Sequence, residues 1–357
     1  MSEYRELLRR LSDVNGIPGF ERRVAAMVKD ELQDICEIRN DRLGSIICRL
    51  KSSGPGPKVA LAGHMDEIGF LVKHIAKEGT IKFQNLGGWW DQVLLGQPVV
   101  IETRNGQVPG VIGATPPHLV DPDKANSVVK AADMFIDVGA SDKETVEKLG
   151  VRPGDPISPA AACINLAVED RMLGKAWDDR VGVALFVHAL KRLNGQSLPC
   201  EVYGVGTVQE EVGLRGATTS AFAINPDVAI ILESAIPGDV PGIKEEDSSV
   251  KLGEGATIYL MDGSMIANPR LRDLVIDVCE QNDIKHQFAM LSRGGTDGGK
   301  YHITAEGVPS IVLGVAARHI HSHFGIIDLN DYAATLDLLC KLLVRLDADT
   351  VASLTAL

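Results

Sequence analysis

Aromatic residues and basic charge are both scarce in this sequence. Only 4% of the residues are aromatic, which disfavours a row of rings for stacking on single-stranded nucleic acid. Lys and Arg number 36 against 48 Asp and Glu, and the net charge of −12 opposes binding to a phosphate backbone. No segment approaches the ~18 apolar residues of a membrane-spanning helix. The composition therefore predicts a protein that binds neither nucleic acid nor a membrane.

Paired cysteines are also missing. The chain has six cysteines but no C-x-x-C motif, and several of them lie inside apolar runs such as residues 338–343. This pattern is typical of reduced, buried thiols in a cytosolic protein. The first residues are charged and predict a helix, whereas a secretory signal would have an apolar core there. We therefore expect a cytoplasmic location.

The length and the pattern of the chain predict two domains. At 357 residues the chain exceeds the usual size of one hydrophobic core. Helix and strand patterns alternate towards both ends, whereas short β-like runs fill the stretch between them, with a hairpin signal at Asn105-Gly106. The simplest interpretation is an α/β domain formed by residues 1–68 and 162–357. A small β-barrel or sandwich at residues 69–161 interrupts it.

Acidic and imidazole side chains recur where the predicted strands end. Four strands are predicted at residues 59–62, 201–208, 227–232 and 309–315, and they are followed by His64 and Asp66, by Glu210 and Glu211, by Glu233, and by His321. Asp178 and Asp179 stand at the start of a predicted helix, residues 180–193. Ligands bind beyond the carboxyl ends of the strands in open α/β sheets, so we expect these side chains to share one rim.

This combination of groups predicts a dinuclear metal centre. Imidazole and carboxylate groups are ligands for Zn²⁺ and its transition-metal neighbours. Two ions ~3.5–4 Å apart need one shared carboxylate and further ligands on each side. Asp178 suits the shared position, with His64 and Glu233 on one ion and Glu211 and His321 on the other.

Two acidic residues remain outside this ligand set. Glu210 is free to take a proton from the attacking water and later to protonate the leaving amine. Asp66 stands two residues from His64 and suits a second carboxylate that fixes the tautomer of that imidazole. Each feature also has an ordinary structural explanation, since adjacent glutamates commonly lie in solvated loops and aspartates before a helix cap it.

Five motifs surround these residues, and two more lie in the predicted barrel. They are Gly63-His-Met-Asp-Glu-Ile-Gly69, Trp177-Asp-Asp-Arg-Val-Gly182, Val208-Gln-Glu-Glu-Val-Gly213, Arg293-Gly-Gly-Thr-Asp297 and Arg318-His-Ile-His-Ser322, with Gly87-Gly-Trp and Gly110-Val-Ile-Gly-Ala-Thr-Pro-Pro-His118 in the barrel. This ordered set resembles the M42 metallo-aminopeptidases, or tetrahedral aminopeptidases, some of which were formerly labelled endoglucanases. The resemblance covers nearly the whole chain.

The resemblance implies a mixed-sheet catalytic α/β domain with helices on both faces and an inserted β-barrel used for oligomerisation. Dimers would assemble into a hollow tetrahedral dodecamer. It also implies a cis peptide between Asp178 and Asp179, Glu210 as general base, and two divalent ions per subunit, Zn²⁺ first, with Co²⁺ or Mn²⁺ as alternatives. Many relatives carry Asp where this chain has Glu233, and several carry Pro at the position of His323, for which the sequence offers no explanation.

Together these inferences predict an aminopeptidase in which a hydroxide bridging two metal ions attacks the first peptide bond of a substrate. Three alternatives remain open: a deacylase or carboxypeptidase on the same centre, a glycosidase with a carboxylate pair, and a noncatalytic assembly protein. The preferred N-terminal residue is open as well. An acidic preference needs a cation in the pocket, and the candidates are Arg215, Lys244 and Arg293.

Overall fold

The chain is described by a computed structural model that covers residues 2–120 and 127–356. Within these residues the largest element is a mixed 11-stranded sheet in the order β1-β2-β12-β3-β13-β16-β17-β11-β10, to which β14 adds beside β16, and β15 beside β14. The strands are β1 Cys36–Asn40, β2 Ile46–Leu50, β3 Lys58–His64, β10 Ile164–Asn165, β11 Arg171–Gly174, β12 Glu201–Thr207, β13 Val228–Ala235, β14 Ala256–Met261, β15 His286–Met290, β16 Ser310–Arg318 and β17 Gly325–Asp328.

The centre of this sheet consists of the parallel strands β12, β3, β13 and β16. Alternate residues of β13 enter two different cores, with Ile230 and Leu232 on one face and Ala229 and Ile231 on the other. A parallel sheet is normally covered on both faces, and its strands are apolar on both sides for that reason.

Helices cover both faces, as the fold class predicts. On one face pack α1 Ser2–Asp13, α2 Arg22–Leu32, α4 Trp177–Leu193, α6 Pro269–Gln281 and α8 Leu329–Leu343, and on the other pack α5 Arg215–Ile224 and α7 Gly298–Tyr301. A last helix, α9 Ala348–Ser353, follows α8. No helix in the described ranges combines the length and the apolar character that crossing a membrane requires.

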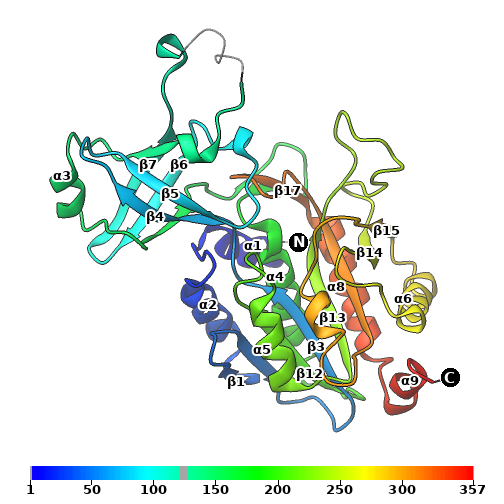
Figure 1. Cartoon of the computed structure of the whole chain (residues 1–357). Helices are drawn as coiled ribbons and strands as arrows, with labels where there is room; N and C mark the ends of the chain where they lie inside the picture. The colour runs from blue at the N-terminus through cyan, green and yellow to red at the C-terminus, as the bar shows by residue number, and fades with distance from the viewer. Residues whose placement is uncertain (1, 121–126, 357) are drawn as a thin grey trace.

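A closed antiparallel barrel lies beside the sheet, at the upper left of Figure 1. Its strands are β4 Gly69–Ile75, β5 Ile81–Leu86, β8 Phe135–Asp137, β7 Gly106–Gly113, β6 Pro98–Thr103 and β9 Pro156–Pro159, and α3 Lys143–Lys148 and the short helices η1 Asp91–Val93, η2 Pro117–Leu119 and η4 Ala131–Asp133 lie in its connections. The barrel has a core of its own, which includes Phe70, Ile101 and Ile136. The predicted hairpin at Asn105-Gly106 is confirmed, since β6 pairs with β7 across it.

The barrel strands begin and end close to the predicted limits of the inserted domain. The exact boundaries at residues 69 and 161 stay a prediction, and residues 121–126 inside that range lie outside the described residues. Three strands run further than predicted. Those expected to stop at residues 62 and 315 continue to His64 and Arg318, and the one expected to stop at Leu232 continues to Ala235, because β13 keeps pairing with β16 through Ala235 and Ala316. Glu233 therefore lies inside a strand and not after it.

Candidate active site

The candidate site lies at the carboxyl ends of the central parallel strands. His64 is the last residue of β3 and pairs with Thr207, the last residue of β12. Glu233 lies in β13 two residues beyond Ile231, which pairs with Ala62 of β3, so Glu233 reaches the level of His64. The position agrees with the general rule that ligands bind beyond the carboxyl ends of such strands.

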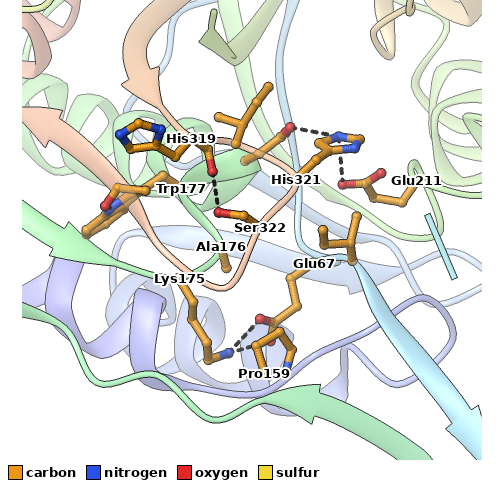
Figure 2. Close-up of a pocket in the computed structure, with 13 residues that line it drawn as sticks. Glu67, Pro159, Lys175, Ala176, Trp177, Glu211, His319, His321 and Ser322 are labelled. Atoms are coloured by element: carbon orange, nitrogen blue, oxygen red, sulfur yellow. Dashed lines mark hydrogen bonds and ion pairs between the residues drawn. The ribbon is translucent and has the colours of Figure 1, made fainter. Parts of the chain in front are cut away.

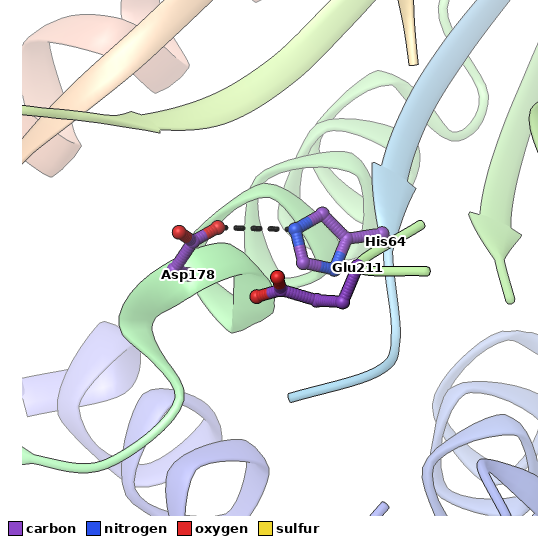
Figure 3. Close-up of side chains that lie close together, drawn as sticks. All are labelled: His64, Asp178 and Glu211. Carbon is purple, nitrogen blue, oxygen red and sulfur yellow. Dashed lines mark hydrogen bonds and ion pairs between the residues drawn. The ribbon is translucent and has the colours of Figure 1, made fainter. Parts of the chain in front are cut away.

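Asp178 lies between two imidazole rings. One of its carboxylate oxygens is 3.0 Å from Nε2 of His64 (Figure 3), and the other is 3.3 Å from Nε2 of His321. His321 also faces Glu211, with 3.6 Å between Nε2 and the nearer carboxylate oxygen (Figure 2). A carboxylate whose two oxygens face two different histidines suits the shared ligand of two metal ions.

The two remaining glutamates complete the cluster on the side of His64. Nε2 of His64 is 3.9 Å from a carboxylate oxygen of Glu233 and 4.0 Å from one of Glu210. Both glutamates are more than nine-tenths buried. The structure therefore brings all five predicted ligands and the predicted base into one cluster, and their individual roles stay predictions.

Asp179 is a member of the cluster to which the sequence assigned no role. Potential ligand atoms of His64, Asp179 and Glu233 lie within 4.8 Å of one another, as do those of His64, Asp178 and Glu211. The two carboxylate oxygens of Asp179 accept the backbone N–H groups of His64 and Gly182 at 3.0 and 2.9 Å, so it orients the end of β3. Its position next to Asp178 in the sequence could have indicated that it belongs to the site. A cis peptide joins the two residues, as the resemblance implied.

Asp66 makes hydrogen bonds that hold His64 and the backbone of Glu210 and Glu211 in place. Nδ1 of His64 is 3.0 Å from the main-chain carbonyl of Asp66 and 3.6 Å from its carboxylate. Because a carbonyl only accepts, Nδ1 carries a proton and Nε2 faces the site, where it donates to Asp178 at 3.0 Å and would bind a metal after losing its proton. The Asp66 carboxylate accepts the backbone N–H groups of Glu210 and Glu211 at 3.0 and 3.1 Å. The carbonyl therefore holds the imidazole, and the carboxylate joins the loops after β3 and β12.

Several carboxyl groups are crowded together in the cluster, with the imidazoles of His64 and His321 among them. Burial and the neighbouring carboxylates raise the pKa values of Glu210, Glu233 and Asp179 well above the ordinary range, and burial together with Asp178 raises the pKa of Glu211 to about 8. Burial also opposes ionisation of Asp178, but hydrogen bonds from His321 and His64 hold its pKa below its usual range.

The composition of this cluster fits divalent cations. In the described part of the chain, none of its carboxylates forms an ion pair with lysine or arginine. Oε1 of Glu211 is buried without a hydrogen-bond partner. Buried charges are normally paired or bound to metal, and oxygen and imidazole donors suit Zn²⁺, Co²⁺ and Mn²⁺.

A cavity of about 890 Å³ opens onto the cluster. Its lining includes the five predicted ligands and Glu210, together with apolar side chains such as Tyr259 and Leu291. This size is ample for a peptide terminus, since small-molecule sites commonly measure ~300–1,000 Å³. A second pocket, which shares Asp178 and His321 in its lining and is drawn in Figure 2, measures only about 20 Å³ and has room for little more than a water molecule.

The lining of the cavity distinguishes between the three basic residues that the sequence offered as contacts for an acidic substrate. Arg293 is part of its lining and forms no ion pair within the described residues. The side chain of Arg215 donates to Gln209, and Lys244 pairs with Glu246; neither residue lines the cavity. Arg293 is therefore the candidate for contact with an acidic substrate.

The other two histidines of the 319–323 segment take no direct part in the cluster. His319 and His321 have left-handed backbone angles, φ 63° and 56°, so the segment is a loop. His319 is exposed and lines the small pocket. His323 is buried against Trp89 of the barrel.

Comparison with protein families matches residues 44–338 to the M42 glutamyl aminopeptidase family. The FrvX protein of Escherichia coli (strain K12) is 41% identical over 350 residues, 97% of this chain and 96% of the relative. The glutamyl aminopeptidase of Lactococcus lactis is 32% identical over 97% of this chain and 98% of its own. The lysyl aminopeptidase of Pyrococcus furiosus is 33% identical over 96% and 97%.

Solved structures of aminopeptidases also superpose closely on this chain. A TET aminopeptidase from a marine sediment archaeon of the Thaumarchaeota superposes with a TM-score of 0.97 at 44% identity, covering 99% of each chain. The TET1 peptidase of Pyrococcus horikoshii, which can assemble into a tetrahedron or a large octahedral shell, has a TM-score of 0.87 at 31% identity, covering 96% of this chain and 100% of its own.

Proposed function

The chain belongs to the M42 family of aminopeptidases and is a peptide hydrolase, and we propose that it removes N-terminal residues from peptides at the cluster around Asp178. The observation that carries this proposal is the position of Asp178 between His64 and His321, with 3.0 and 3.3 Å from its two oxygens to their Nε2 atoms. This arrangement opens into a cavity large enough for a peptide end.

We propose that the cluster holds two divalent ions, Zn²⁺ first, with Co²⁺ or Mn²⁺ as alternatives. Asp178 would contribute to both ions, His64 and Glu233 to one, and Glu211 and His321 to the other. Ions in such a site polarise the scissile carbonyl and lower the pKa of a bound water. The unpartnered oxygen of Glu211 and the missing basic partners support this assignment.

The protein's own contribution to the chemistry rests on Glu210. Its carboxylate takes the proton from the attacking water, whose oxygen adds to the carbonyl carbon. The same proton then passes to the leaving nitrogen as the C–N bond breaks, so Glu210 returns to its starting state. Asp66 holds the backbone of Glu210 in place through its N–H group.

The alternatives from the sequence have less support. A glycosidase needs two carboxylates beside the sugar and no imidazole ligands, whereas here two histidines face Asp178. A deacylase or carboxypeptidase would use the same centre, and the aminopeptidase names of the relatives favour a free N-terminus.

We further propose that the protein forms a homo-oligomer through the inserted barrel, residues 69–161, with dimers that build a tetrahedral dodecamer. The assembly of the Pyrococcus horikoshii TET1 peptidase supports this proposal. Light scattering on the purified protein tests it, and a monomer at micromolar concentration would contradict it. The cytoplasmic location stays a prediction from sequence.

The function is tested with aminoacyl-p-nitroanilides that carry acidic, basic, apolar and aromatic residues. Metal-loaded protein should cleave at least one substrate with a free amine, chelation should abolish cleavage, and Zn²⁺ or Co²⁺ should restore it. Each substrate is also tested with a blocked amine. Cleavage of blocked substrates alone would contradict an aminopeptidase and favour the deacylase.

A further inference from the structure

A segment of the barrel reaches the candidate metal site. Residues 87–89 lie between β5 and η1, and the carbonyl oxygen of Gly88 accepts a hydrogen bond from Nδ1–H of His321 at 2.7 Å. The backbone can approach this closely because residue 88 has no side chain: a Cβ there would lie 3.0 Å from Nδ1 of His321. At Gly87, where φ is +82°, a Cβ would lie 3.0 Å from a carboxylate oxygen of Glu211.

The next residue anchors this segment in the barrel. Trp89 stacks on Phe70, with 4.7 Å between ring centroids and an interplanar angle of 17°, and its indole N–H donates to the carbonyl of Gly69 at 3.0 Å. On its other side lies His323, with 5.3 Å between ring centroids. The barrel core is thus connected through Trp89 to the loop that carries His321.

The place of His323 accounts for a residue that the sequence left unexplained. Its side chain is 1% exposed, and neither ring nitrogen has a hydrogen-bond partner. The ring therefore acts as a packed aromatic surface against Trp89. Only Ser322 separates it from His321, so its packing restricts the loop from which His321 extends.

The two histidines of the site differ in how firmly they are held. The side chain of His64 is 2% exposed and belongs to a central strand, whereas that of His321 is 36% exposed and belongs to a loop. Nδ1–H of His64 donates to a carbonyl of its own segment, that of Asp66. Nδ1–H of His321 donates to a carbonyl of the barrel, that of Gly88, 233 residues away in the chain.

We propose that the barrel is a working part of the metal centre, in which Gly88 and Trp89, with His323, are positioning residues for His321. The Gly88 carbonyl keeps the proton on Nδ1, so that the Nε2 lone pair points at the site beside Glu211 and Asp178. Loss of such a partner commonly weakens metal binding about 10–100-fold. The inference rests on the proposed function. It predicts that only one of the two ions, the one bound by His321, depends on the barrel for its affinity.

The test uses two neighbouring tryptophans. Trp89→Leu removes the stacking surface, and Trp90→Leu is the matched control because Trp90 is 60% exposed. Bound Zn²⁺ per subunit and the two dissociation constants are measured by competition with a chromogenic chelator. We expect Trp89→Leu to weaken one ion about 10–100-fold, to leave the other within about twofold, and to recover activity at high Zn²⁺. Trp90→Leu should match the unmodified protein.

Two further variants keep the inference testable if Trp89→Leu does not fold. His323→Phe preserves a packed ring and should bind both ions like the unmodified protein, whereas His323→Ala should weaken one. Equal weakening of both ions, or unchanged affinity in both Trp89→Leu and His323→Ala, would overturn the inference while leaving the proposed function intact. An unmodified protein that binds no metal would overturn both.

Discussion

Removing the metal ions should make the folded protein less stable as the pH rises. The prediction follows from the buried carboxylates of the site, which lack lysine or arginine partners among the described residues. Without a cation the protonated form is favoured in four of them, Asp179, Glu210, Glu211 and Glu233, whose pKa values burial raises. A folded state that retains protons which the unfolded chain releases loses stability as the pH increases.

Glu211 sets the size of the effect. Burial raises its pKa from 4.5 to about 8, so between these values the folded state holds a proton that the unfolded state has lost. Each pH unit in this window costs about 1.4 kcal/mol, which gives about 4 kcal/mol between pH 5 and pH 8. His321 acts in the same direction: although burial alone would lower its pKa, hydrogen bonding to Asp178 raises it to about 10, and the stability of its charged form is lost above pH 6.5.

The assay is urea unfolding at pH 5 and pH 8, followed by tryptophan fluorescence at one protein concentration, with chelated and with Zn²⁺-loaded protein. Glu21 also has a pKa raised by burial, to about 7, but it contributes to both forms and cancels in their comparison. Glu211→Gln should remove its share of the pH dependence from the chelated protein, and the exposed Glu280→Gln should not. A chelated protein that is as stable at pH 8 as at pH 5, relative to the loaded form, would refute the reasoning.

Three substitutions test other parts of the molecule. Glu210→Gln should lower kcat by about 10²–10⁴-fold with unchanged metal content, since it removes the proton acceptor; near-normal kcat would exclude Glu210 as the base. Arg293→Gln should lower kcat/KM for glutamyl-p-nitroanilide by about 10-fold or more through loss of a charge-assisted bond, with leucyl-p-nitroanilide little affected and Lys244→Gln as the matched control. An equal effect on both substrates would contradict an acidic pocket. Lys175→Met removes the cation that buried Glu67 contacts in Figure 2 and leaves it Arg180, whose guanidinium is 3.6 Å away. The loss of the nearer partner should cost about 3 kcal/mol. Calorimetry should then record a melting temperature roughly 4 °C lower, and Lys175→Met combined with Glu67→Gln should recover part of the loss.

The elements that could be predicted from sequence were those with strong periodicity. The helix expected at residues 3–14 is α1, and β4, β5, β6 and β7 fall within one residue of the strands expected at 69–75, 80–86, 97–103 and 107–113, whereas the shorter β8 and β9 were not predicted. Helix α5 was missed, because its buried face consists of small residues such as Gly216, Ala217 and Ser220, while its largest side chain, Phe222, is 83% exposed. Its apolar pattern is weak, and only packing against the sheet identifies it.

The candidate site was predictable to a similar extent. Strand ends in a parallel sheet meet at one edge, so the sequence positions of His64, Glu211 and Glu233 were enough to expect a cluster. Asp66 was expected to hold His64 through its carboxylate, but its main-chain carbonyl is nearer to that imidazole than its carboxylate is. Backbone acceptors carry no signature in sequence, since every residue has one.

The sequence by itself determined the α/β class, an inserted β domain and the set of acidic and imidazole residues, because periodicity, turn residues and motif order are local properties of a chain; whether that β domain is a barrel or a sandwich was left open by the pattern. Only the tertiary structure decided that Asp178 lies between two imidazoles, that Arg293 and not Lys244 lines the cavity, and that Gly88 of the barrel holds His321. These are contacts between segments far apart in the chain. They depend on how these distant segments pack together, which no local pattern encodes.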